Sequence, residues 1–190
     1  MSTLSRPLRR HQALERLFHP ASIAVIGASP RAGAFGAAVL RNLGGYSGRV
    51  YPVNARYPQI GELVCYPSIG AVPEPVDCAL IATAREAVEP IIHECIAAGV
   101  GGAIVFASGY AETGRAERAA EQDRIAAIAQ QSGMALLGPN TVGMVNALCG
   151  AAITFMDITP VPPPARRAIG LVSQSGALGM ALAQAGSSTR

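Results

Sequence analysis

A glycine-rich turn follows the first apolar run of the chain. The run from Ile23 to Ile26 ends at Gly27, and Gly33 and Gly36 precede an amphipathic stretch. A glycine-lined turn at the start of a helix leaves backbone N–H groups free to bind a phosphate. The spacing therefore predicts a strand, a phosphate-binding turn and a helix in that order.

The spacing of this turn departs from the dinucleotide fingerprint. Gly-x-Gly-x-x-Gly counted from Gly27 would need glycine where Ser29 and Ala32 stand. The next apolar run ends in Asn54, Ala55 and Arg56, without the carboxylate that NAD enzymes place on the ribose. Arg56 instead suits a ribose that carries a phosphate, which leaves NADP or coenzyme A as ligand. A solvent-facing arginine after a strand is the alternative.

The composition excludes several other chemistries. All fifteen basic residues are Arg, so Schiff-base chemistry and the lysine of a Walker loop are both excluded. The net charge of +3 arises within residues 1–20 and the remainder is neutral, which disfavours nucleic acid as a partner. The four cysteines form no Cys-x-x-Cys pair, so we expect no metal site and a reduced, cytoplasmic protein. No apolar run is long enough for a membrane span.

Short Val/Ile/Ala-rich runs alternate with amphipathic stretches, the pattern of a parallel sheet with crossover helices. The predicted strands are Ser22–Gly27, Arg49–Val53, Asp77–Ile81, Gly102–Phe106 and Ala135–Leu137. The predicted helices are Gly36–Leu43, Arg85–Ala98 and Arg115–Gln131. Near-continuous apolar strands imply a sheet covered on both sides, hence an α/β fold with a Rossmann-like, doubly wound parallel sheet. We assign it residues 15–148, after an N-terminal arm of residues 1–14.

The chain changes character after the predicted domain. Residues 149–166 contain the run Thr159-Pro160-Val161-Pro162-Pro163-Pro164, which cannot continue a helix or a central strand, and they are predicted to be a linker. Residues 167–190 then show a new strand, Arg167–Val172, and a new helix, Gly176–Ala185. We expect this to be the beginning of a second domain, incomplete in this chain.

Five segments carry a resemblance to a known family. They are Phe18–Ser29 with its His-Pro-Ala-Ser-Ile-Ala-Val-Ile-Gly-Ala-Ser sequence, Tyr51-Pro52-Val53-Asn54, Gly109-Tyr110-Ala111-Glu112-Thr113-Gly114, Gly138-Pro139-Asn140 and Ser173-Gln174-Ser175-Gly176. In this order they resemble the NDP-forming acyl-CoA synthetases, which are similar to the alpha subunit of succinyl-CoA synthetase. The same module heads certain protein lysine acetyltransferases. The family usually has Pro-Lys where this chain has Ala55-Arg56, which keeps a cation but changes its reach.

The resemblance implies a set of sites and partners. The coenzyme A (CoA) pyrophosphate loop would be Gly27, Ala28, Ser29, Gly33 and Gly36. Asn54 and Arg56 would lie near the adenosine end, and Gly138, Pro139 and Asn140 would border the reaction centre. Residues 167–190 would open a flavodoxin-like domain. Mg, ATP or ADP and a separate or downstream ATP-grasp subunit or domain would belong only to the complete enzyme.

The resemblance places the catalytic phosphohistidine outside this chain. None of His11, His19 and His93 stands in the family's phosphohistidine context, so no catalytic residue is assigned. Supporting roles are expected of Glu112, Asn140, Ser173 and Ser175. Glu112 would either orient the phosphohistidine or cap the start of the next helix. The serines would begin a helix that holds the phosphohistidine.

Three functions therefore compete. The first is the CoA-binding N-terminal portion of an NDP-forming acyl-CoA ligase, without ligase activity of its own. The second is a regulatory or carrier module that binds CoA, such as the head of an acetyltransferase. An NADP-dependent enzyme is the third, although no Tyr-Lys or His constellation accompanies the turn.

Overall fold

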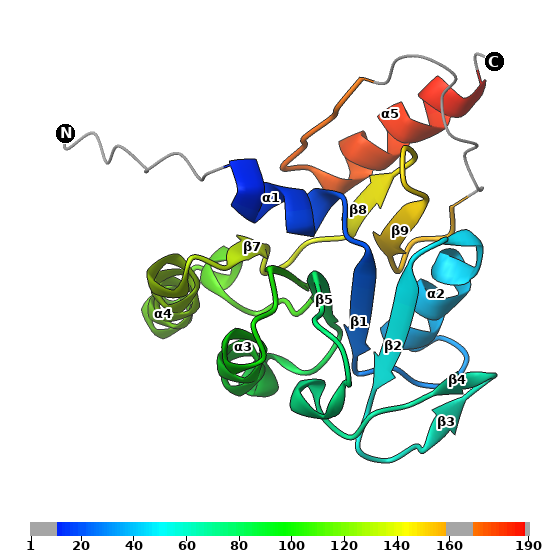
Figure 1. Ribbon diagram of the computed structural model, residues 1–190. Helices are drawn as coiled ribbons and strands as arrows, with labels where there is room; N and C mark the ends of the chain where they lie inside the picture. Colours follow the sequence, from blue (N-terminus) through cyan, green and yellow to red (C-terminus); the bar gives the residue numbers. More distant parts are fainter. Residues whose placement is uncertain (1–10, 159–168, 189–190) are drawn as a thin grey trace.

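A computed structural model describes residues 11–158 and 169–188 and contains a five-stranded parallel sheet (Figure 1). Its strands are β1 (Ser22–Ile26), β2 (Arg49–Val53), β5 (Cys78–Ile81), β6 (Gly102–Val105) and β7 (Ala135–Leu137). All five match the predicted strands to within one residue at each end. β1, β5 and β6 are buried along their whole length, which explains their unbroken runs of apolar residues.

Helices cover both faces of the sheet. On one face lie α1 (His11–Phe18) and α2 (Phe35–Asn42), and on the other lie α3 (Val88–Ala97) and α4 (Ala116–Ser132). Alternate residues of β1 enter the two cores, because successive side chains of a strand point to opposite faces. The fold is thus Rossmann-like and doubly wound, as the sequence predicts.

The order of the strands creates a crevice beside β1. The order is β2-β1-β5-β6-β7, and a parallel bridge between Val53 and Tyr66 extends it beyond β2. From β1 the chain proceeds first to one side and later returns to pair β5 on the other side. In open α/β sheets ligands bind at such a switch point, outside the carboxyl ends of the strands. The loops after β1, β2 and β5 are therefore the ones to examine.

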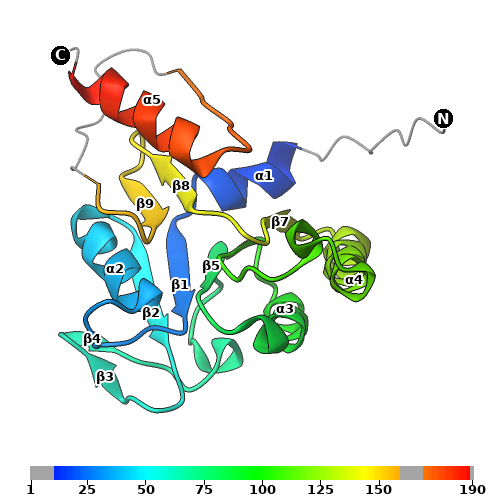
Figure 2. The same ribbon diagram turned by 180° about the vertical axis from the view of Figure 1, so that it is seen from behind.

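Two hairpins lie outside the sheet and were not predicted (Figure 2). β3 (Gln59–Ile60) pairs β4 (Leu63–Val64), and β8 (Gly143–Asn146) pairs β9 (Ala151–Thr154). The described residues also form four 3-10 helices: η1 (Leu43–Gly45), η2 (Ile69–Ala71), η3 (Arg85–Ala87) and η4 (Ala111–Thr113). No helix in the described ranges is both long and apolar enough to cross a membrane.

The predicted linker of residues 149–166 is wrong at its start. β9 is buried at all four positions and packs against α2. The Asn42 side-chain amide donates to the carbonyl oxygens of Thr154 and Met156, at 2.7 and 2.9 Å. The packed domain therefore continues beyond residue 148, because α2 would otherwise expose the apolar face that β9 covers. The proline run Thr159–Pro164 lies outside the described residues.

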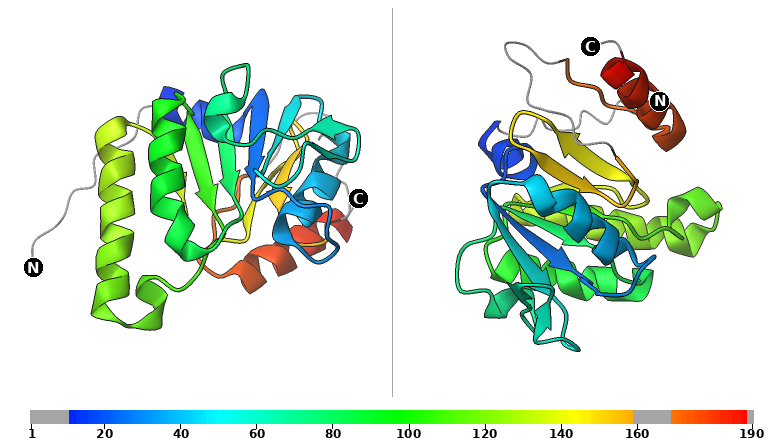
Figure 3. Two further views of the ribbon diagram at one scale, coloured as in Figure 1. Left: turned by 90° about the horizontal axis from the view of Figure 1, so that it is seen from below. Right: turned by 90° about the vertical axis from the view of Figure 1, so that its right-hand side faces the viewer.

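The secondary structure near the two ends of the chain matches the sequence-based prediction only in part. Of the predicted N-terminal arm, residues 1–10 lie outside the description, and α1 begins at His11. Of the predicted strand Arg167–Val172, residues 169–172 are not a strand, since no described strand offers them a hydrogen-bonding partner. The predicted second helix is present as α5 (Gly176–Ser188). Figure 3 shows the β8–β9 hairpin between the sheet and α5.

Candidate functional site

The glycine turn predicted to bind phosphate lies at the crevice. Gly27 directly follows β1 and has a φ of 87°, a conformation that L side chains rarely adopt. Its N–H donates to the Val53 carbonyl at 3.0 Å, and a Cβ on it would lie 2.9 Å from the Ala82 carbonyl carbon. Glycine is required here because the backbones of three neighbouring strands converge on this residue.

The start of α2 is packed tightly onto the same turn. A Cβ on Gly36 would stand 2.9 Å from the Cα of Ala28 and closer still to the carbonyl oxygen of Gly27. Gly33 has a φ of 83° and open space around it. No side chain caps the first turn of α2 after Ala34. Its backbone N–H groups are therefore free of a side-chain acceptor and can bind an anion.

Asn54 joins the end of β2 to the phosphate turn. Its side-chain amide donates to the Ala28 carbonyl at 2.8 Å, and its Oδ1 accepts the Arg56 backbone N–H at 2.9 Å. The Cys65 thiol donates to the Asn54 carbonyl at 3.6 Å, and burial raises the pKa of this thiol. Asn54 thus fixes the loop after β2 against the turn after β1. Arg56 is the charged residue of that loop.

Two arginines supply positive charge at this edge. Arg56 is exposed, and in the described part of the chain no carboxylate pairs with its guanidinium. Arg31 is equally exposed within the turn, and its backbone N–H donates to Ser29 Oγ at 3.1 Å. Sequence reasoning missed Arg31, although a cation among the turn glycines is itself a signal for an anionic ligand.

A second turn lies at the far end of the same edge, after β7. The Gly138–Pro139 peptide is cis, and Asn140 has a φ of 56°. Asn140 donates its backbone N–H to the Ala107 carbonyl at 2.9 Å, and a Cβ on Gly138 would lie 2.6 Å from the Val105 carbonyl oxygen. The three predicted residues are therefore fixed against the end of β6.

Glu112 stabilises the loop that follows β6. Its Oε1 and Oε2 accept the backbone N–H groups of Gly109 and Tyr110, at 2.6 and 3.1 Å. The capping interpretation of Glu112 therefore has a structural basis, but the carboxylate caps the loop before it and not the start of α4.

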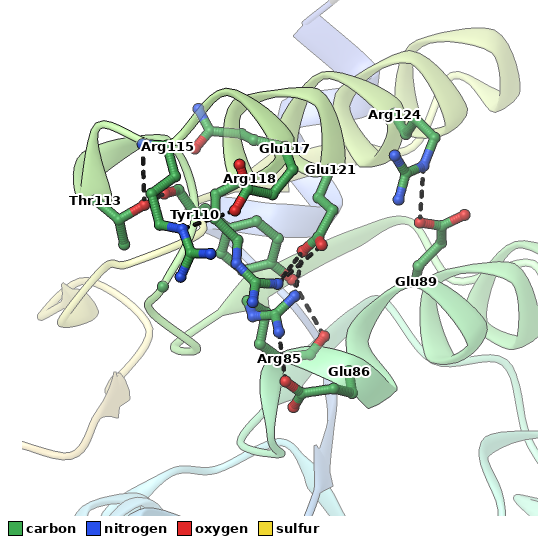
Figure 4. A network of polar contacts seen from close by, with 12 residues as sticks. Arg85, Glu86, Glu89, Tyr110, Thr113, Arg115, Glu117, Arg118, Glu121 and Arg124 are labelled. Atoms are coloured by element: carbon green, nitrogen blue, oxygen red, sulfur yellow. Dashed lines mark hydrogen bonds and ion pairs between the residues drawn. The ribbon is translucent and has the colours of Figure 1, made fainter.

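A network of ion pairs joins η3, which leads into α3, to α4, and Tyr110 of this loop contacts it (Figure 4). Arg85 pairs with Glu121 and Glu86, and Arg118 pairs with Glu121 at 2.9 Å. Burial acts to raise the pKa of Glu121, but the hydrogen bonds from Arg118 and Arg85 outweigh it and hold the pKa below its usual range. Tyr110 donates its hydroxyl to the Arg85 carbonyl at 3.4 Å, and burial raises its pKa to about 12. Arg85 is thus neutralised, unlike Arg31 and Arg56.

The serine segment lies beside the turn that follows β7. Ser175 Oγ accepts the Leu178 N–H at 3.3 Å and caps α5, while Ser173 Oγ donates to the Ser175 carbonyl at 2.8 Å. A Cβ on Gly176 would be 3.1 Å from Val142 Cγ1. The start of α5 thus faces the chain just after Asn140, but nothing joins it to Asn54 or Arg56 among the described contacts.

A hollow of about 630 Å³ lies elsewhere, between the chain around Pro73 and the end of α3. Its lining holds two carboxylates, Glu94 and Glu74, the latter paired with Arg49 at 2.7 Å, and includes no cation. A lining with carboxylates and without a cation disfavours a ligand that carries phosphates. The open edge formed by the turns after β1, β2, β6 and β7 remains the candidate site.

Comparisons with known proteins agree with this geometry. The trans-feruloyl-CoA synthase of an unknown prokaryotic organism is 39% identical to the chain, over 92% of the chain and 25% of its own length. The alpha subunit of the ADP-forming acetate–CoA ligase I of Pyrococcus furiosus is 38% identical, over 90% of the chain and 37% of its own length. The chain therefore spans a quarter to somewhat more than a third of these relatives.

A solved structure gives the same result in three dimensions. The dinucleotide forming acetyl-coenzyme A synthetase 1 of Ca. Korarchaeum cryptofilum, in complex with phosphate and ADP, superposes with a TM-score of 0.78. It is 38% identical and matches 92% of this chain and 36% of its own. Residues 21–147, which include the turns after β1, β2, β6 and β7, match the family described as CoA binding domain. The chain belongs to the CoA binding domain family.

Proposed function

We propose that the chain is the CoA-binding N-terminal portion of an NDP-forming acyl-CoA ligase. The observation that carries this proposal is the turn Gly27–Gly36, locked by Asn54 to a loop that presents Arg56. This arrangement offers backbone donors to a pyrophosphate and a separate cation to a further phosphate, and CoA carries both groups. NAD lacks the further phosphate.

Each region of the edge has a proposed role. Gly27, Ala28, Ser29, Gly33 and Gly36 bind the pyrophosphate, with Arg31 as an added cation. Asn54 positions the loop of Arg56, which binds the 3′-phosphate. Gly138, Pro139 and Asn140 border the thiol end of CoA, where the start of α5 with Ser173 and Ser175 also lies.

The remaining parts of the reaction belong to a longer protein or a second subunit. The named relatives, an ADP-forming ligase subunit and a synthetase in complex with phosphate and ADP, support a complete enzyme that uses a nucleotide. We propose Mg and ATP or ADP as its further ligands, an ATP-grasp domain or subunit as partner, and residues 167–190 as the beginning of a second domain. The free cysteines fit a reducing compartment such as the cytoplasm.

Calorimetric titration tests the proposal. The chain should bind CoA about tenfold or more tightly than dephospho-CoA, because a charged hydrogen bond to the 3′-phosphate contributes about 1.5–3 kcal/mol. Arg56→Ala should weaken CoA binding to the level of dephospho-CoA and leave dephospho-CoA binding unchanged. Arg124→Ala, which removes an exposed arginine of α4 that pairs with Glu89 of α3, is the matched control and should bind as the parent chain does. Absence of CoA binding would refute the function, and equal affinity for both ligands would refute the role of Arg56.

A further inference from the structure

An exposed aromatic ring stands at the start of the phosphate-binding helix. Phe35 is the first residue of α2, and 50% of its surface is exposed. Its ring stacks on that of Phe155, with centroids 4.4 Å apart and 24° between the planes. It also meets Phe106 edge to face, with centroids 6.2 Å apart. Phe106 is buried, so the cluster has one face in the core and one open face.

The position of the Phe35 ring is fixed from several sides. Gly36, the next residue, is pressed against Gly27 and Ala28, which leaves the backbone of Phe35 little freedom. Phe106 stands edge to face against Phe155 at 4.9 Å and completes the cluster. A ring held in this way loses little conformational entropy when a ligand covers it, so it is preorganised for binding.

The aromatic cluster spans the distance between the two turns of the candidate site. Phe35 begins α2 directly after the turn that follows β1, and Phe106 directly follows β6. A Cβ on Gly143, shortly after the cis turn, would lie 3.1 Å from the Phe106 ring. The cluster therefore bridges the loop proposed to bind pyrophosphate and the turn proposed to border the thiol.

We propose that the open face of Phe35, supported by Phe155, is the surface that receives the pantetheine arm of CoA. The assignment rests on the proposed function and extends it to a part of the ligand for which no residue has been named. The arm is uncharged and carries methyl and methylene groups, so an apolar surface suits it better than a cation does. The charges at this edge, Arg31 and Arg56, serve the phosphates at the other end.

The test compares two ligands in two variants of Phe35 and one control variant. Adenosine 3′-phosphate 5′-diphosphate has the phosphates of CoA but lacks the pantetheine arm. Phe35→Ala should weaken CoA binding about tenfold, because the arm loses apolar contact, and should leave binding of the nucleotide fragment unchanged. Phe35→Leu, which keeps an apolar side chain, should lose about threefold. Leu148→Ala removes a 55% exposed side chain from the turn between β8 and β9 and should change neither affinity.

The outcomes separate this assignment from the function on which it rests. Unchanged CoA affinity in Phe35→Ala would overturn the assignment while the function stands. Equal losses for CoA and for the fragment would also overturn it, since the ring would then act through the shape of the phosphate loop. A parent chain that binds neither ligand would overturn the proposed function first. Thermal unfolding of each variant verifies that the losses come from a folded protein.

Discussion

The close approach of α2 to the end of β1 makes Gly36 the most informative position to perturb. In Gly36→Ala the new methyl group would stand 2.9 Å from the Cα of Ala28, well inside the 3.4 Å at which ordinary contact begins, and closer still to the Gly27 carbonyl oxygen. Both neighbours are backbone atoms and cannot rotate away, so α2 must move. Such overpacking costs about 1–3 kcal/mol. The higher helix propensity of alanine offsets about 1 kcal/mol of this loss in the free energy of unfolding.

We therefore expect Gly36→Ala to lower the free energy of unfolding by up to about 2 kcal/mol, a loss that at its upper limit lowers the melting temperature by about 4–8 °C. CoA affinity should fall as well, since movement of α2 would displace the proposed pyrophosphate loop. Gly44→Ala is the matched control, because Gly44 follows the same helix and has no atom within 4 Å of an added Cβ. Circular dichroism melts and CoA titrations measure both quantities. A Gly36→Ala protein at least as stable as the parent would show that helix propensity, and not close packing, governs this site.

Two further predictions concern stability and thiol reactivity. Asp77 accepts hydrogen bonds from Arg16 and a backbone N–H, and these outweigh burial and hold its pKa below the usual range. Asp77→Asn should lower the free energy of unfolding by about 2 kcal/mol at pH 7, as urea unfolding measures. This deficit should begin to shrink as the pH falls below about 4, where the unfolded carboxyl takes up a proton, and should vanish only below the lowered pKa of the folded carboxyl. A deficit independent of pH would contradict this. Burial raises the pKa of the Cys78 thiol, and it raises the pKa of the Cys95 thiol to about 12. An alkylating reagent at pH 8 should therefore modify the partly exposed Cys149 first, as mass spectrometry can show. Rapid labelling of Cys78 in the folded chain would refute the burial argument.

The sheet could be predicted because its strands are buried on both faces. Such strands need an unbroken apolar run, and the runs around Val25, Leu80 and Ile104 are visible in the sequence. β9 gave no comparable signal: its four residues include Thr154 and stand close to a proline run. What buries β9 is α2, more than a hundred residues earlier, and a contact at that separation leaves no local pattern.

The candidate site could be predicted only where backbone conformation demands glycine. Gly27 and Gly36 could be assigned to the turn from the sequence, because glycines spaced between an apolar run and an amphipathic stretch indicate a tight turn from a strand into a helix. The bond from Asn54 to Ala28 joins two loops and depends on how the strands pair. The role of the half-exposed Phe35 ring likewise cannot be predicted from the sequence, because it depends on the stacking of Phe155, which is distant in the chain. Pairings between distant segments are therefore what the structure adds.

Because β9 packs on the apolar face of α2, the order in which the two segments are synthesised determines when that face can be buried. Asn42 and the Thr154 carbonyl that it binds are separated by 112 positions in the chain. At about 5–20 residues per second, the ribosome completes α2 about 6–22 s before its partner strand exists. During that interval the apolar face of α2 is open to solvent or to a chaperone. The nascent chain can therefore form β1 and β2 early, but the helix that carries the proposed anion site reaches its final environment only after nearly the whole domain has been made.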